Sequence, residues 1–272
     1  MPFFGKHDRI PLGIYVHIPF CRSKCQYCDF YSVTEKETEL LDQYLYALIA
    51  HIKEAGSLAP NHVVDTVYFG GGTPSYLGAK RLMKILKAVK KLYHVEKNAE
   101  ITLEANPATA NSEKLKALRA LGINRLSVGV QSLDDGELAA LGRLHTGSEA
   151  LVFLSAARRA GFHNISVDLM FGIPAQTTKS FADTLDTVTA LSPEHISAYG
   201  LRVEEGTPFF ARRATLPLPD EDAEAEMAEL AVGKLTHAGY EHYEISNYAK
   251  AGKRSRHNMR YWMGADYLGL GP

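Results

Sequence analysis

The sequence predicts an α/β protein built on a parallel sheet. Short apolar runs alternate with amphipathic stretches in six strand–helix cycles of a few tens of residues each, which is typical of parallel β/α units. Polar and glycine-rich motifs also fall at or just after the ends of several different predicted strands. In β/α barrels that edge collects functional groups from many strands, whereas an open sheet gathers its ligand at one switch point. We therefore predict a full or partial β/α barrel.

The predicted strands are short apolar runs, and each ends in a loop. Their apolar side chains are nearly continuous, which indicates burial on both faces. The strands are expected at residues 13–18, 65–69, 100–106, 125–130, 165–171 and 195–201. The first runs into a cysteine loop, the second into Gly70-Gly71-Gly72, and the third stops at Pro107.

The connecting segments have the spacing of amphipathic helices. Apolar residues recur three and four positions apart, and glycine follows several of these segments, as at helix ends. The helices are expected at 37–54, 78–93, about 112–121, 148–160 and 178–191. After residue 201 the rhythm changes: an acidic helix is expected at 220–237, a strand at 240–246, and a turn-like tail at 269–272.

The composition narrows the class of protein. The 272 residues are 46% hydrophobic and 22% charged, with a formal net charge of −1, as in ordinary soluble proteins. No excess of positive charge indicates a nucleic-acid partner. No secretory signal and no apolar run of membrane-spanning length is present. With three clustered cysteines, these features predict a reducing, cytoplasmic location.

All three cysteines lie in one stretch, Cys21, Cys25 and Cys28, spaced C-x3-C-x2-C. Structural zinc sites and iron–sulfur clusters usually have four protein ligands. A [4Fe–4S] cluster held here would therefore have one iron without a protein thiolate, as a reactive site requires. Two other interpretations remain at this point: a zinc site completed by His7 or His17, and unrelated buried thiols. The odd count and the spacing argue against disulfides.

Other candidate groups follow the later strands. The glycine run at 70–72 allows close approach of a ligand, or is simply a tight turn. Glu104 and Asp168 interrupt apolar strands, so they either bind ligand hydroxyl or ammonium groups or form structural ion pairs with Arg125 or Arg143. Arg143 can in addition donate to a ligand, as can the amide of Gln131.

His257 lies among arginines and aromatic residues near the end of the sequence. Histidine is a common haem ligand, and aromatic rings with arginines suit a large flat anionic cofactor. The alternative is a polar turn anchored by two aromatic side chains.

Taken together, these motifs resemble the radical S-adenosylmethionine (SAM) superfamily and, within it, the HemN/HemW family. The segments that carry the resemblance are YVHIPFC at 15–21, the C-x3-C-x2-C motif, GGGTPS at 70–75, GVQS at 129–132, DLMFGIP at 168–174 and HNxxYW at 257–262. They cover the chain from about residue 14 to its end, and their order is specific.

The resemblance implies a [4Fe–4S] cluster on Cys21, Cys25 and Cys28, with SAM chelating the fourth iron. It implies a partial (β/α)6 TIM-like barrel, with a radical SAM core at 1–205 and the start of a smaller C-terminal region, incomplete in this sequence, at 206–272. The residues implied for the SAM region, which holds one or two SAM molecules, are Tyr15, Gly71, Gly72, Thr73, Glu104, Gln131, Arg143 and Asp168.

Two branches of the family differ near the cysteines. The oxygen-independent coproporphyrinogen III oxidase branch has a further cysteine, as C-x3-C-x2-C-x-C, where this chain has Phe30, and a long extension before the cluster. The His257 motif is typical of the haem chaperone branch. The resemblance therefore implies haem as cargo, His257 as a haem-binding residue, a haem-acceptor protein and, if SAM is cleaved, an electron donor. No catalytic residue is assigned. The alternatives are the oxidase and a zinc-stabilised binding module.

Overall fold

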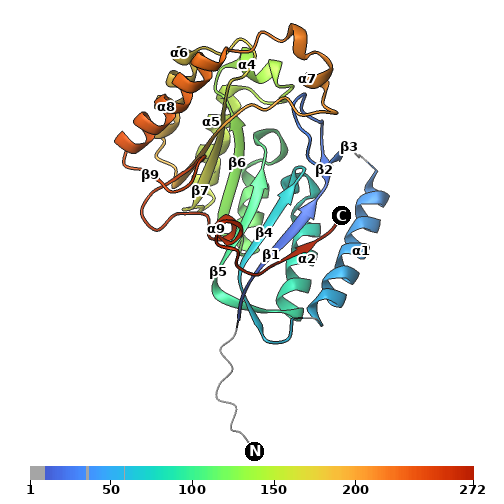
Figure 1. Ribbon diagram of the computed structural model, residues 1–272. Helices are drawn as coiled ribbons and strands as arrows, with labels where there is room; N and C mark the ends of the chain where they lie inside the picture. Colours follow the sequence, from blue (N-terminus) through green and yellow to red (C-terminus); the bar gives the residue numbers. More distant parts are fainter. Residues whose placement is uncertain (1–9, 35–36, 58) are drawn as a thin grey trace, which may run out of the picture.

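The computed structural model describes residues 10–34, 37–57 and 59–272, and Figure 1 shows their arrangement. Six strands pair in parallel and in chain order, as the strand–helix cycles predict. They are β1 (Ile10–Ile18), β4 (His62–Gly71), β5 (His94–Ala105), β6 (Arg125–Gln131), β7 (Ile165–Phe171) and β8 (His195–Gly200). The predicted strand positions are confirmed, with boundaries that differ by a few residues.

The helices between these strands also lie where the apolar spacing predicts them. They are α1 (Thr38–Gly56), α2 (Ala79–Leu92), α3 (Ser112–Ala120), α5 (Gly147–Arg159) and α6 (Thr178–Ala190). A short helix, α4 (Asp135–Ala140), was not predicted. Two-residue strands, β2 (Phe20–Cys21) and β3 (Val33–Thr34), pair at the base of the cysteine loop. Within the described residues, no helix has the length and apolar character needed to cross a membrane.

Side-chain contacts at the helix ends explain several boundaries. Before α5, the Thr146 hydroxyl accepts from the Glu149 N–H at 3.2 Å, and the Glu149 carboxylate accepts from the Thr146 N–H at 2.9 Å. This reciprocal capping box satisfies backbone donors that the helix leaves free. Helix α9 (Arg256–Met263) begins after Ser255 and ends at Gly264, whose positive φ of 62° favours glycine.

The C-terminal residues extend the same sheet at both edges. β10 (Asn247–Ala249) pairs antiparallel with β8, and β9 (Glu241–His242) follows it, so the strand predicted at 240–246 is mostly loop. The predicted turn-like tail is wrong, because β11 (Tyr267–Leu270) pairs in parallel with β1. In the described chain the order is β11-β1-β4-β5-β6-β7-β8-β10-β9, and its two outer strands do not pair with each other. The barrel is therefore partial.

The two faces of the sheet differ in chemistry. Residues such as Ile14, Phe69 and Leu103 belong to the hydrophobic core, which also holds apolar residues of the helices that flank the strands and of α8 (Glu221–His237). The alternate residues, such as Thr66 and Ser127, are polar and point to the inner face. The prediction that the strands are buried on both faces is confirmed. The prediction that they are almost continuously apolar is wrong, because the inner face is polar, which suits a ligand.

Candidate functional site

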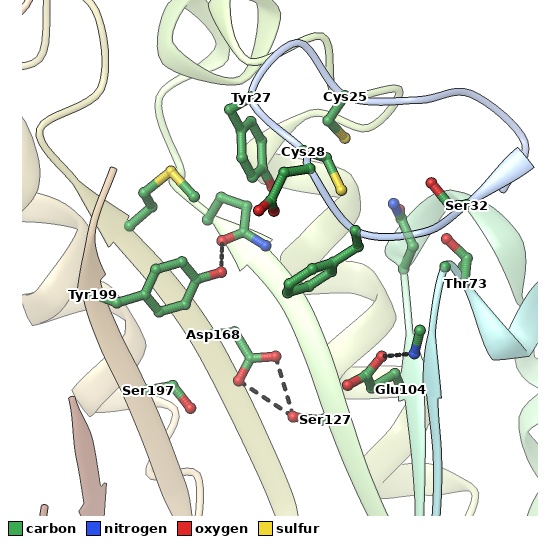
Figure 2. A pocket seen from close by; sticks show the side chains of 18 of the residues that line it. Cys25, Tyr27, Cys28, Ser32, Thr73, Glu104, Ser127, Asp168, Ser197 and Tyr199 are labelled. Carbon is green, nitrogen blue, oxygen red and sulfur yellow. Dashed lines mark hydrogen bonds between the residues drawn. The ribbon is translucent and has the colours of Figure 1, made fainter. Parts of the chain in front are cut away.

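A pocket of about 650 Å³ lies on the inner face, at the C-terminal ends of the central strands. The cysteine loop covers one side of it, and β4 to β8 supply its floor (Figure 2). Seven of the eight residues expected around SAM contribute to its wall, all except Tyr15, and so do the three cysteines. The sequence motifs therefore converge on one pocket, as the barrel architecture predicts.

Cys21, Cys25 and Cys28 are free thiols around the mouth of this pocket. Cys21 is buried and the other two are partly exposed; burial raises the pKa of the Cys28 thiol. Among the residues that the structure describes, no three His, Cys, Asp or Glu side chains converge closely enough to hold one metal ion. Zinc needs its ligands within about 2.3 Å of one point, whereas the cysteines of an iron–sulfur cluster are spread around a larger body. The three thiols fit a cluster better than they fit zinc.

Among the described residues, His17 is the histidine considered for a zinc site, and it is not free to act as a ligand. Both ring nitrogens of His17 already have partners: Nδ1 lies 3.1 Å from the Tyr15 hydroxyl, and Nε2 lies 2.9 Å from the carbonyl oxygen of Tyr31. His7, the other candidate, lies outside the described residues.

The glycine run packs directly against the strand that leads to Cys21. The N–H groups of Gly72 and Thr73 donate to the carbonyl oxygens of Ile18 (2.8 Å) and Phe20 (2.9 Å). A Cβ on Gly72 would lie 2.9 Å from the Phe20 carbonyl oxygen and 3.0 Å from Cys21 Sγ. Glycine is therefore required at this position, because the two segments approach too closely for a side chain.

Arg143 and Gln131 reach the pocket from β6 and the segment after α4. Arg143 Nη1 lies 3.6 Å from Cys25 Sγ, and its Nη2 donates to the carbonyl oxygen of Gly129. Gln131 has a φ of 70°, which is unusual for a residue with a side chain. Its Oε1 accepts a hydrogen bond of 2.8 Å from Tyr199. Such backbone strain is often found at functional sites.

The two carboxylates predicted for ligand contact face each other across the pocket floor (Figure 2). Glu104 accepts from the Tyr68 hydroxyl at 2.8 Å and the Gly71 N–H at 3.1 Å. Asp168 accepts from the Ser127 hydroxyl at 3.1 Å. Burial raises the pKa of Glu104 to about 7, and burial also raises that of Asp168. Among the described residues, no ion pair within 4.0 Å includes either carboxylate, so the structural ion pairs considered above are not formed.

Arg125 lines the same floor, although the sequence identified it only as a possible ion-pair partner. Its side chain is 1% exposed, and its Nε and Nη1 atoms have no hydrogen-bond partner among the residues that the structure describes. A signal for it exists in the sequence: Arg125, Ser127, Gly129 and Gln131 alternate with apolar residues along β6, which places all four on the inner face.

Tyr15 lies behind the pocket rather than in its wall. Its ring stacks on that of Tyr68, with centroids 6.0 Å apart, and packs under Gly70. The structure therefore gives Tyr15 a supporting position next to the glycine run.

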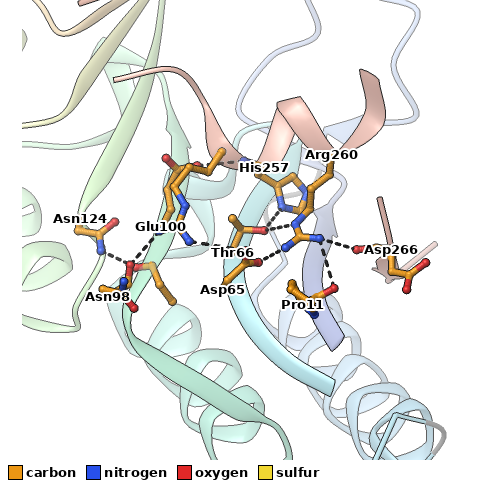
Figure 3. A network of polar contacts seen from close by, with 11 residues as sticks. Pro11, Asp65, Thr66, Asn98, Glu100, Asn124, His257, Arg260 and Asp266 are labelled. Atoms are coloured by element: carbon orange, nitrogen blue, oxygen red, sulfur yellow. Dashed lines mark hydrogen bonds and ion pairs between the residues drawn. The ribbon is translucent and has the colours of Figure 1, made fainter. Parts of the chain in front are cut away.

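His257 also lies outside the pocket wall, in a network of polar contacts between α9 and the strands (Figure 3). It is 0% exposed, its Nδ1 lies 2.9 Å from Thr66 Oγ1, and its Nε2 lies 3.0 Å from the Tyr261 hydroxyl. Burial, with the charges of Arg260 and Arg125, lowers its pKa to about 3. The ring is therefore neutral with both nitrogens engaged, which is not the position that direct ligation of haem iron requires.

The rest of this network fixes α9 in place. The Arg260 guanidinium pairs with Asp65 and donates to the carbonyl oxygen of Asp266 at 3.0 Å, and the Glu100 carboxylate accepts from the His257 N–H at 3.2 Å. We call Asp65, Thr66, Glu100, His257 and Arg260 the α9 network. It positions the two α9 residues that reach the pocket, Asn258 and Trp262.

Large apolar side chains surround the mouth of the pocket. Phe30, Ile245 and Trp262 line it and are 65%, 86% and 63% exposed. Exposed apolar side chains gathered at a pocket indicate a binding surface. We refer to these three residues as the apolar rim.

Comparisons with known proteins agree with this geometry. Residues 15–188 match the radical SAM superfamily. Proteins named heme chaperone HemW are 41% identical in Haemophilus influenzae and 39% in Bacillus subtilis, over 96% and 94% of this chain and 69% and 68% of theirs. A mitochondrial radical S-adenosyl methionine domain-containing protein of mouse is 40% identical over 96% of this chain and 59% of its own length.

Among solved structures, the coproporphyrinogen III oxidase HemN of Escherichia coli superposes with a TM-score of 0.86 at 29% identity. The match covers 97% of this chain and 64% of that one, so the chain spans just under two thirds of HemN. A methylornithine synthase, with a TM-score of 0.53 at 17% identity, shares the fold. From these matches and the pocket that the motifs form, the chain belongs to the radical SAM superfamily and, within it, to the HemN/HemW family.

Proposed function

We propose that this protein is a cytoplasmic haem chaperone of the HemW type, which binds haem and passes it to an acceptor protein. It would carry a [4Fe–4S] cluster on Cys21, Cys25 and Cys28 and an exchangeable SAM. The observation that carries the proposal is the convergence of three free thiols, a polar pocket floor and the apolar rim on one side of the barrel.

The cluster part of the proposal is supported by the space and donors around the thiols. Gly72 leaves room next to Cys21, and Arg143 supplies an N–H toward Cys25. Hydrogen bonds to cluster sulfurs tune the properties of such centres. A cluster held by three cysteines offers one iron with an open position, which SAM would occupy through its amino and carboxylate groups.

The SAM part is supported by the chemistry of the floor. Glu104 and Asp168 are acceptors suited to hydroxyl and ammonium groups, while Gln131 and Arg143 supply donors. These residues hold their positions through contacts within the chain, such as the bond from Tyr199 to Gln131, so the floor is organised before a ligand arrives.

The haem part is supported by the names of relatives about 40% identical and by the apolar rim. A flat apolar macrocycle with anionic edges matches exposed aromatic side chains, because they supply a large rigid contact area. In this proposal His257 acts indirectly: it holds α9, which carries Trp262.

The alternative activity, oxidative decarboxylation of coproporphyrinogen III, is favoured by the likeness to HemN. Phe30 argues against it, because it occupies the position where the oxidase branch has a cysteine. Formation of protoporphyrinogen from coproporphyrinogen III by the reconstituted protein, with SAM and a reductant, would overturn the chaperone assignment.

Haem binding is the direct test. The anaerobically reconstituted protein is titrated with haemin, with and without SAM, and the Soret band is followed. Trp262→Ala should weaken binding by roughly fivefold to tenfold, as expected for the loss of an aromatic contact of about 1 kcal/mol. Tyr46→Ala is the matched control, since Tyr46 is equally exposed (67%) but lies on α1, away from the pocket. Unchanged Soret spectra, or equal effects of both substitutions, would refute the proposal.

A further inference from the structure

Arg125 is a buried cation whose side-chain donors are largely unused. It is the first residue of β6, is 1% exposed, and lines the pocket floor. Its Nε and Nη1 atoms donate to no group, and no ion pair of the described residues includes it. A buried guanidinium is costly unless it is compensated. Its charge must therefore be offset by groups that are close enough to act through space.

The titratable and charged groups around it come from every element that faces the floor. They are Tyr68 on β4, Glu100 and Glu104 on β5, Arg143 after α4, Asp168 on β7, His195 and Tyr199 on β8, Tyr243 and Glu244 before β10, and His257 on α9.

Four of these groups are neutral near pH 7. Burial lowers the pKa of both His195 and His257, so both rings are neutral. Burial likewise raises the pKa of Tyr68 and Tyr199, so both phenols are protonated. Arg143 is already engaged by Gly129 and Cys25. Arg125 is thus the cation available to the carboxylates of the floor.

Glu104 and Asp168 both respond to Arg125. For Glu104, burial and the Asp168 charge raise the pKa, whereas hydrogen bonds and the Arg125 charge lower it. For Asp168, burial raises the pKa, and Arg125 is the largest influence that lowers it. Loss of the Arg125 charge should therefore shift both carboxyl groups toward their neutral, protonated forms.

We propose that Arg125 is a positioning residue whose charge favours the ionised forms of Glu104 and Asp168, so that the pocket floor attracts the cationic part of its ligand. This inference rests on the proposed function, in which the ligand is SAM, a sulfonium that also carries an ammonium group. Direct contact between Arg125 and an anionic group of the ligand is less favourable, because that group would lie next to two carboxylates.

The first measurement needs no ligand. Carbonyl-stretch infrared spectra, recorded as a function of pH, follow carboxyl protonation in the wild type, Arg125→Met and Arg125→Lys. Glu104→Gln and Asp168→Asn assign the bands. Arg125→Met should raise the protonation midpoints by about one pH unit or more, while Arg125→Lys keeps them within a few tenths. Midpoints that stay unchanged in Arg125→Met would overturn the inference.

The second measurement is SAM binding to the reconstituted protein by calorimetry between pH 6 and pH 9. If the pKa of Glu104 rises by one unit from about 7, the ionised fraction at pH 7 falls roughly fivefold, so SAM binding to Arg125→Met should weaken by the same factor. Binding should recover at pH 9. S-adenosylhomocysteine, which lacks the sulfonium charge, should show a smaller pH dependence. Equal weakening at every pH would overturn the inference, because it would indicate a direct contact or a structural role.

Two controls distinguish an effect specific to Arg125 from loss of the fold and from a general effect of removing an arginine. Arg119→Met, at an arginine whose Nε donates to the carbonyl oxygen of Gly161 on the outer side of the barrel, should leave both measurements unchanged. Thermal melting followed by circular dichroism verifies that each variant is folded. If the wild type binds no SAM, the proposed function fails, while the infrared titration still decides the role of Arg125.

Discussion

The inner face of the barrel contains two groups of buried polar residues that differ in how fully the chain satisfies them. In the α9 network, Arg260 has a carboxylate and a carbonyl oxygen as partners, and both ring nitrogens of His257 are engaged. In the pocket floor, counting only described residues, Nε and Nη1 of Arg125 have no hydrogen-bond partner, and no ion pair includes Glu104. A polar group that the chain itself satisfies stabilises the fold, whereas one left unsatisfied is available to a ligand.

The largest effect is expected at the cysteines. Cys25→Ala should abolish cluster assembly, lowering the iron content after reconstitution from about four per chain to near zero, since three cysteines are the minimum here. The free energy of unfolding of the cluster-free protein should change by less than about 1 kcal/mol, because Cys25 is only partly buried. Ser23→Ala, in the same loop, is the control and should retain its iron. A Cys25→Ala variant that keeps a full cluster would remove the assignment.

The α9 network should show the opposite pattern. Arg260→Met leaves Asp65 without its main partner, so the free energy of unfolding should fall by about 3 kcal/mol, while cluster assembly persists. Chemical denaturation measures the first quantity and absorbance of the reconstituted cluster the second.

The matched control for Arg260 is Arg254→Met. Arg254 pairs with Glu241 on the surface, where both side chains are about half exposed and solvent screens the pair, so its loss should leave the free energy of unfolding almost unchanged. If both variants lose equal stability, the distinction between the network and an ordinary surface pair is wrong.

The smallest effect is expected at glycines, and it distinguishes a glycine required by a close contact from one with open space around it. Gly72→Ala should destabilise the protein by about 1–3 kcal/mol and speed cluster loss, since its Cβ would press on Phe20 and Cys21. Gly233→Ala in α8 is the control: a Cβ there has no neighbour within 4 Å, so it should stabilise by up to about 1 kcal/mol. Cluster lifetime in air measures the first effect and thermal melting the second; a Gly72→Ala variant with the wild-type lifetime would contradict this account.

Most of the fold was predictable, because the signals are local. The alternation of apolar runs and helical spacing predicts the six central strands and their helices, and the positions of Glu104, Gln131 and Asp168 at strand ends predict that they meet. The edge strand β11 was missed, since its glycine-rich sequence is typical of a turn and its pairing depends on β1, some 250 residues earlier.

The sequence predicted which motifs form the site, but it did not predict the direction in which each side chain points. Residue type indicates what His257 and Tyr15 are able to do, while packing decides which way they point, and both lie behind the pocket wall. Within the described chain, Arg125 Nε and Nη1 have no hydrogen-bond partner, and no local sequence pattern reveals this, because it depends on side chains from other strands.

The pairing of β11 with β1 has a consequence for synthesis on the ribosome. β1 leads into the cysteine loop and is made early, but one of its two neighbours, β11, is made about 250 residues later. One edge of β1 therefore stays without its partner until almost all of the described chain has been translated, and α9 reaches the barrel interior only then. Such late, long-range pairing slows the completion of folding. We expect the interior around the cysteines to stay open during this interval, when iron and sulfide can enter before α9 and β11 are in place.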